Sequence, residues 1–69
     1  MKSVSGKELC RILEINGWTL ARINGSHHIY KKEGEFALLT VPVHGNIALK
    51  TGLLASLLKL SGLTEENLL

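Results

Sequence analysis

Apolar residues follow a helical period near the start of this chain. They are Leu9, Ile12 and Leu13, at the i, i+3, i+4 spacing of one helix face. Ser5 and Glu8 have the spacing of a capping box, in which each side chain satisfies the other residue's backbone N–H. Asn16-Gly17 is typical of a helix end, because glycine adopts the left-handed conformation there. The pattern predicts a helix over residues 6–16.

The period then changes to that of β-strands. Segments rich in aromatic, β-branched and other large apolar residues lie between turn signals, and they are 18–23, 27–32 and 35–41. Asn24-Gly25 tolerates positive φ at both central positions of a type I′ turn, and Glu33-Gly34 marks a second turn. Pro42 closes the third strand because proline cannot donate to a ladder. These signals predict an antiparallel three-stranded meander.

Two-residue loops at both turns predict which side chains share a face, since alternate residues of a strand point to opposite sides. In that register Arg22 pairs with His27, and Ile29 pairs with Leu20 and Leu38. The expected core face consists of Trp18, Leu20, Ile29, Phe36 and Leu38. The opposite face consists of Thr19, Ala21, His28, Tyr30, Lys32, Ala37 and Leu39.

A second helix is predicted after the loop at residues 43–46. Thr51 is its expected N-cap, and Gly62 its stop. The leucines of its broad apolar face are Leu53, Leu54, Leu57, Leu58 and Leu60. Thr64 followed by two glutamates predicts one more helical turn. The resulting α-β-β-β-α order favours one α+β domain over residues 1–69, with both helices on one face of the sheet.

Composition narrows the class of protein only a little. The chain has 69 residues, is 45% hydrophobic and 20% charged, and carries a net charge of +2. No apolar run approaches the ~20 residues that a membrane span needs. The N-terminus lacks the apolar core of a secretory signal, and the lone Cys10 is expected to be a buried filler. These features predict a cytoplasmic protein. The charge permits a polyanionic partner without requiring one.

Three histidines carry the candidate chemistry: His27, His28 and His44. His27 and His28 are neighbours on a predicted strand, so they point apart and do not share a metal ion or a substrate. The chain contains no Asp, and no Ser or Cys lies in a nucleophile turn beside a histidine and an acid. The pattern therefore disfavours a metal site and a nucleophilic triad, and no cofactor is expected.

Acid–base catalysis by a single histidine is enough for cleavage of RNA. The 2′-hydroxyl is an internal nucleophile, so the protein supplies only a base, positive charge at the phosphate and a proton for the leaving oxygen. The cations available near a histidine are Arg22, Lys31, Lys32 and Lys50. The same arrangement is also typical of a solvated surface, so spacing by itself leaves both interpretations open.

Three motifs together resemble one family. They are Gly25-Ser26-His27-His28-Ile29-Tyr30, then Thr40-Val41-Pro42-x-His44-Gly45-Asn46, and then Leu49-Lys50-Thr51-Gly52-Leu53-Leu54-x-Ser56-Leu57-Leu58-Lys59. This combination is similar to the HicA toxin family, also called YcfA-like, and the similarity extends along the whole chain.

The resemblance implies a fold like that of double-stranded-RNA-binding domains. It also implies a metal-independent mRNA interferase of a type II toxin–antitoxin pair, a monomer when free that binds a HicB-like antitoxin. The residue directly after Gly-Ser, His27, matches the catalytic histidine, while His28 falls at a position that the family varies. The residues expected to bind RNA beside His27 are Arg22, Ser26, Lys31, Lys32 and Lys50. His44 matches a common family histidine, expected to order its loop through a ring N–H bond or to contact RNA.

One departure from the family pattern lies in the second predicted helix. Many relatives carry an arginine close to the matching Ser-Leu pair, whereas this chain has Ala55 there and only Lys59 in the helix. Without that arginine, the RNA-binding surface of this chain is expected to be weaker, or differently placed, than in a typical member. A non-catalytic RNA-binding module of the same fold, which holds RNA by shape and 2′-hydroxyl contacts, is the alternative.

Overall fold

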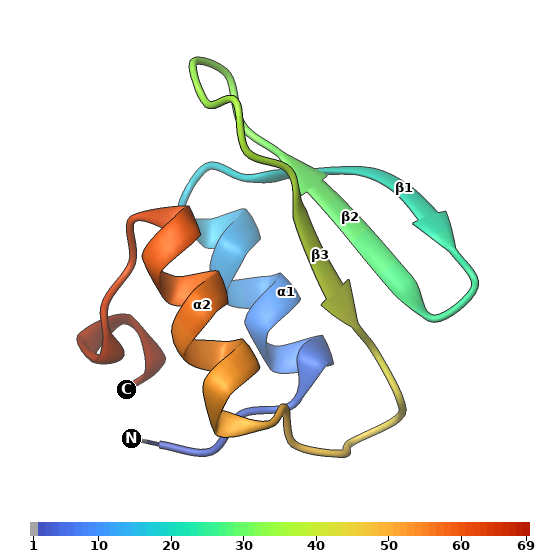
Figure 1. Ribbon diagram of the computed structural model, residues 1–69, viewed down its shortest axis with the longest axis vertical. Helices are drawn as coiled ribbons and strands as arrows, with labels where there is room; N and C mark the ends of the chain where they lie inside the picture. Colours follow the sequence, from blue (N-terminus) through green and yellow to red (C-terminus); the bar gives the residue numbers. More distant parts are fainter. Residues whose placement is uncertain (1) are drawn as a thin grey trace.

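Two helices cover one face of a three-stranded antiparallel sheet (Figure 1). The computed structural model describes residues 2–69. The elements, in chain order, are α1 (Gly6–Ile15), β1 (Thr19–Asn24), β2 (His27–Lys31), β3 (Leu39–Pro42), α2 (Thr51–Ser61) and the 3₁₀ turn η1 (Glu65–Leu68). The sheet order is β1-β2-β3. The predicted α-β-β-β-α order and the likeness to a double-stranded-RNA-binding domain are confirmed.

The ends of α1 follow the predicted capping chemistry. The Glu8 backbone N–H donates to the Ser5 hydroxyl (3.1 Å), and the Ser5 N–H donates to the Glu8 carboxylate (3.2 Å). Gly17 has φ of 93°, in the left-handed region. Because these bonds satisfy backbone groups that a helix end leaves free, they fix where α1 begins and ends.

Gly6 lets the start of α1 lie directly against the end of β3. A Cβ on Gly6 would stand 2.0 Å from the Pro42 carbonyl oxygen and 3.2 Å from the Val43 Cα. Real Cβ atoms essentially never lie as close as 2.0 Å to another heavy atom, so only glycine permits this approach of two backbones. No local pattern in the sequence indicates this role for Gly6.

The β1–β2 turn lies one residue later than predicted. Asn24 pairs with His27, so the loop residues are Gly25 and Ser26. Gly25 has φ of 62°, and no described non-glycine residue has positive φ. Positive φ at the first central residue alone is the pattern of a type II′ turn, and the predicted type I′ turn is therefore wrong.

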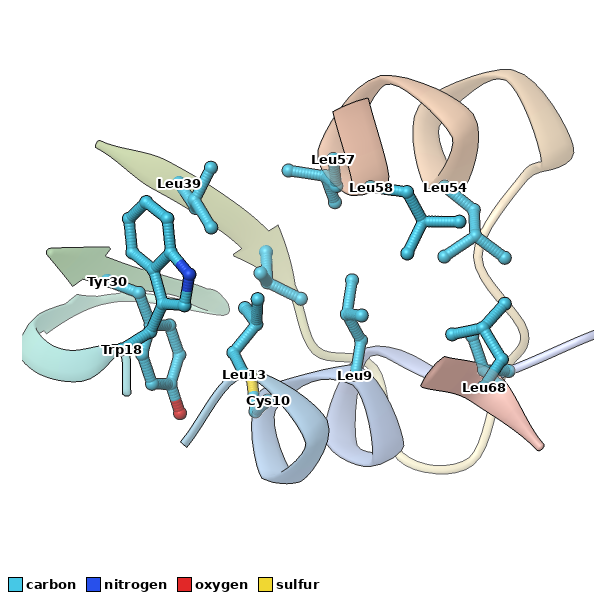
Figure 2. Close-up of a cluster of buried hydrophobic side chains, with 12 residues drawn as sticks. Leu9, Cys10, Leu13, Trp18, Tyr30, Leu39, Leu54, Leu57, Leu58 and Leu68 are labelled. Atoms are coloured by element: carbon cyan, nitrogen blue, oxygen red, sulfur yellow. The ribbon is translucent and has the colours of Figure 1, made fainter. Parts of the chain in front are cut away.

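The predicted core face of the sheet is also wrong, except for Trp18, which is buried in the core as predicted. Tyr30, Leu39 and Val41 pack against the helices, together with Trp18 (Figure 2). The later turn, together with a bulge between Leu20 and Arg22, pairs Leu20 with Tyr30 instead of with Ile29. Ile29 is buried, but it lies on the opposite face, which no helix covers.

The third strand is also shorter than predicted, and this contributes to the reversal of the buried face. β3 begins only at Leu39, and residues 32–38 form a loop that projects beyond the helices (Figure 1). Phe36 and Leu38 lie in that loop and are exposed. Because these two apolar residues lie outside β3, the large apolar side chains that remain in the sheet are mostly on the face of Tyr30 and Leu39, and that face is the one buried against the helices.

α2 ends as predicted but begins one residue earlier. Lys50 is the N-cap residue and Thr51 is the first helical residue, so the predicted Thr51 cap is wrong. Gly62 has φ of 76°, the left-handed conformation expected at the stop. Thr64 and Asn67 form a capping box for η1, confirming the predicted last turn.

The core is mostly leucine and joins all the layers (Figure 2). Its members from the helices and the 3₁₀ turn are Leu9, Cys10, Leu13, Leu54, Leu57, Leu58 and Leu68. Cys10 is buried as predicted, and burial raises the pKa of its thiol. The reactive form of a cysteine is the thiolate, and a raised pKa keeps Cys10 in the thiol form. Cys10 therefore serves as a small apolar residue of the core. None of the described helices is long and apolar enough to cross a membrane.

Candidate functional site

His27 stands on the face of the sheet that the helices leave open. It begins β2 directly after the Gly25-Ser26 loop and is exposed, whereas His28 is half-buried on the helix side. Alternation along the strand therefore places the two rings on opposite faces, as predicted. An anionic ligand can approach His27 without entering the protein core.

Two cations share the open face with His27. Lys31 lies on the same strand, four residues along, and Arg22 pairs with Ile29, midway between the two. Directly paired residues have Cβ atoms about 4.5–5.5 Å apart, and diagonal neighbours are roughly 7–8 Å apart. Arg22, His27 and Lys31 are all exposed. Arg22, diagonal to His27, is close enough to reach a phosphate group bound beside the imidazole, whereas Lys31 adds positive charge farther along the same face.

A second histidine lies at the same end of the sheet. The Val43 N–H donates to the Ser26 carbonyl (2.8 Å), so the chain after β3 runs beside the β1–β2 turn, and His44 follows. The His44 ring is exposed and has no hydrogen bond to residues 2–69. The Ile47 N–H instead donates to the His44 carbonyl (3.0 Å) and closes the turn through the backbone.

Two of the five predicted RNA-binding residues lie away from this surface. Lys32 donates from its Nζ to the Asn16 carbonyl (3.2 Å) and stands 5.9 Å from the centre of the Trp18 ring. Lys50 is exposed at the start of α2, where its carbonyl accepts the Leu54 N–H (2.9 Å). Lys32 therefore tethers β2 to the end of α1. The predicted set that shares one surface is Arg22, Ser26, His27 and Lys31, with His44 beside the turn.

A comparison with protein families gives one match, to the HicA toxin of bacterial toxin–antitoxin systems, over residues 6–63. The matched segment extends from α1 to just beyond α2 and contains every residue of the candidate site. The chain belongs to the HicA toxin family. A search of curated proteins finds no significant match.

The opposite side of the sheet in this HicA toxin holds a groove against α1. Its polar lining includes His28 and Glu14, and the Tyr30 hydroxyl donates to the Glu14 carboxylate (2.6 Å). Burial, reinforced by this bond, raises the pKa of the Tyr30 phenol far above its ordinary value. Tyr30 therefore stays protonated and links β2 to α1. No local spacing connects residues 14 and 30, so the sequence pattern does not predict this contact.

The described residues of the toxin, 2–69, contain no group of three or more His, Cys, Asp or Glu side chains positioned for one metal ion. Metal sites of proteins need three or four converging ligands. The titratable or charged groups that the strand register places on the open face are the His27 imidazole, the Arg22 guanidinium and the Lys31 ammonium.

Proposed function

We propose that this HicA toxin is an mRNA interferase in which His27 is the general base. The observation that supports the proposal is the exposed imidazole beside Arg22 and Lys31 on the open face, in a member of a toxin family. A toxin that cleaves messenger RNA needs access to a flexible polyanion. A face with no helix over it and two cations on it provides that access.

The proposed reaction begins with the neutral imidazole of His27. It removes the proton from a 2′-hydroxyl, and the oxygen attacks the neighbouring phosphorus while the bond from phosphorus to the 5′-oxygen breaks. Negative charge accumulates on the non-bridging oxygens, where Arg22 and Lys31 stabilise it. The products are a 2′,3′-cyclic phosphate and a 5′-hydroxyl end. The leaving oxygen takes its proton from an acid that we do not assign.

Cleavage is expected to survive removal of divalent ions. His27, Arg22 and Lys31 together supply the base and the positive charge, and no metal-donor groups converge at this face among residues 2–69. Excess EDTA should leave the rate of cleavage of a defined RNA unchanged, and the product should carry a cyclic phosphate or its hydrolysis product. Inactivation by EDTA that a divalent ion reverses would contradict the proposed mechanism.

The partner is expected to be an antitoxin that covers His27. Because the open face carries Arg22 and Lys31, the covering surface should be acidic or rich in hydrogen-bond acceptors. Co-expression with the product of the neighbouring reading frame should restore growth to cells that express the toxin, and the two proteins should purify together. A neighbour product that neither binds nor restores growth would contradict this prediction.

A further inference from the structure

The loop between β2 and β3 presents the most exposed aromatic side chain of the toxin. Phe36 is 108% exposed, as open to solvent as in an extended peptide, and Leu38 is 54% exposed. Figure 1 shows the loop projecting past the helices as the outermost part of the molecule at that end. A single exposed apolar residue is ordinary. Two of them on a projecting loop form a surface that a partner can bury.

Both stems of this loop are anchored to the body of the protein. On one side the Lys32 ammonium donates to the Asn16 carbonyl and lies over the Trp18 ring. On the other side Leu39 is fully buried in the core. The Glu35 N–H donates to the Lys32 carbonyl (3.0 Å), and Gly34 provides the positive φ of 84° in the turn. A tip held in this way loses little conformational freedom on binding.

The charge around the tip indicates the chemistry of the ligand. Glu33 and Glu35 are exposed and have no ion pair with any residue from 2 to 69. Two carboxylates beside Phe36 repel the phosphates of RNA, so base stacking on this ring is disfavoured. They instead complement a protein surface on which an apolar pocket has basic residues at its rim.

The tip also lies away from the catalytic candidate. Four residue steps along β2 separate His27 from Lys31, about 13 Å of extended chain, and the loop continues from the Lys31 end. A protein bound at Phe36 therefore need not occupy the position of the RNA phosphate at His27.

We propose that the β2–β3 loop is an anchor for the antitoxin, which inserts Phe36 into an apolar pocket rimmed by lysine or arginine. The inference depends on the proposed antitoxin partnership and adds a second contact to the one over His27. Opposite charges at the two contacts favour one orientation of the antitoxin: an acidic surface meets Arg22 and Lys31, and a basic rim meets Glu33 and Glu35. Buried aromatic side chains commonly dominate the binding energy of such interfaces.

The test compares variants of the full-length toxin for binding to the purified product of the neighbouring reading frame and, separately, for RNA cleavage without it. Phe36→Ala should weaken antitoxin binding at least tenfold while the cleavage rate and melting temperature remain those of the wild type. The matched control is Ile15→Ala, at an exposed apolar residue (73%) at the end of α1, and it should bind normally. The double variant Glu33→Gln with Glu35→Gln should weaken binding several-fold, most strongly at low salt.

Unchanged antitoxin affinity in Phe36→Ala would overturn the proposal. A fall in RNA binding or cleavage in that variant would also overturn it, because the loop would then be a base-stacking contact. Failure of the interferase proposal would look different, since the wild-type toxin itself would cleave no RNA while the effect of Phe36 on antitoxin binding would still be measurable.

Discussion

Replacing His27 with alanine is expected to lower the rate of RNA cleavage by a factor on the order of 10² or more, the usual cost of losing a general base. The side chain is exposed at the start of β2, and alanine keeps the strand backbone intact. The fold should therefore survive. The measurement is the initial rate of cleavage of a defined single-stranded RNA, with circular dichroism and thermal melting to show that the variant is folded.

His28→Ala is the matched control for this prediction. The residue is adjacent in sequence and has the same chemistry, but it faces the groove against α1. Its replacement should reduce cleavage far less and should leave toxicity in cells almost unchanged. A folded His27→Ala protein that cleaves RNA at the wild-type rate would refute the assignment of the base. If the wild-type protein binds RNA but never cleaves it, and both folded variants bind RNA as the wild type does, the non-catalytic RNA-binding module would be supported instead.

Gly6→Ala is expected to lower the free energy of unfolding by about 2–3 kcal/mol, the upper part of the usual range for overpacking a tight contact. The new methyl group would stand 2.0 Å from the Pro42 carbonyl oxygen, so α1 and the end of β3 would have to separate. In a domain of this size such a loss corresponds to a fall of roughly 10–20 °C in melting temperature. Chemical denaturation and thermal melting measure both quantities.

Gly52→Ala controls for the general effect of adding a methyl group to a helix. Gly52 lies in the first turn of α2 with nothing within 4 Å of an added Cβ. Alanine there should maintain stability or raise it by up to about 1 kcal/mol, since alanine has the higher helix propensity. Equal melting temperatures for the two variants would show that the contact of Gly6 with Pro42 is not important for stability.

Local chemistry predicted the element order well because caps and turns act over three or four residues. The Ser5–Glu8 capping box, Gly17 and Gly62 all form as their sequence signals indicate. Such signals need no knowledge of the rest of the chain. The order α-β-β-β-α and the two-layer packing follow from them.

Features that depend on distant contacts were not predictable in the same way. The bulge between Leu20 and Arg22 and the late start of β3 are set by pairing and packing, and together they reverse which face is buried. The burial of Tyr30 depends on its bond to Glu14, sixteen residues away. Lys32 is a further example, since the pattern suggested a phosphate contact and the structure uses the side chain to hold the end of α1.

The candidate site was partly predictable, since alternation along a strand is a local property. It separates His27 from His28 and aligns His27 with Lys31, as the structure confirms. The placement of Lys50 and the neighbourhood of His44 depend instead on how the loop after Pro42 returns to α2. No spacing in the sequence specifies that path. The catalytic roles themselves remain predictions.

Pro42 has a consequence for how this toxin behaves in the absence of its partner. The backbone N–H groups of neighbouring residues in a strand point to opposite sides. Because the Val43 N–H donates toward β2, the backbone nitrogen of Pro42 faces the free edge of β3, and as a proline it has no N–H to offer there. The other edge strand, β1, is interrupted by its bulge. Unpaired edges are templates for intermolecular strand pairing, and both edges of this sheet carry a feature that hinders it. Both features thus hinder aggregation of this toxin from edge to edge and leave its open face exposed.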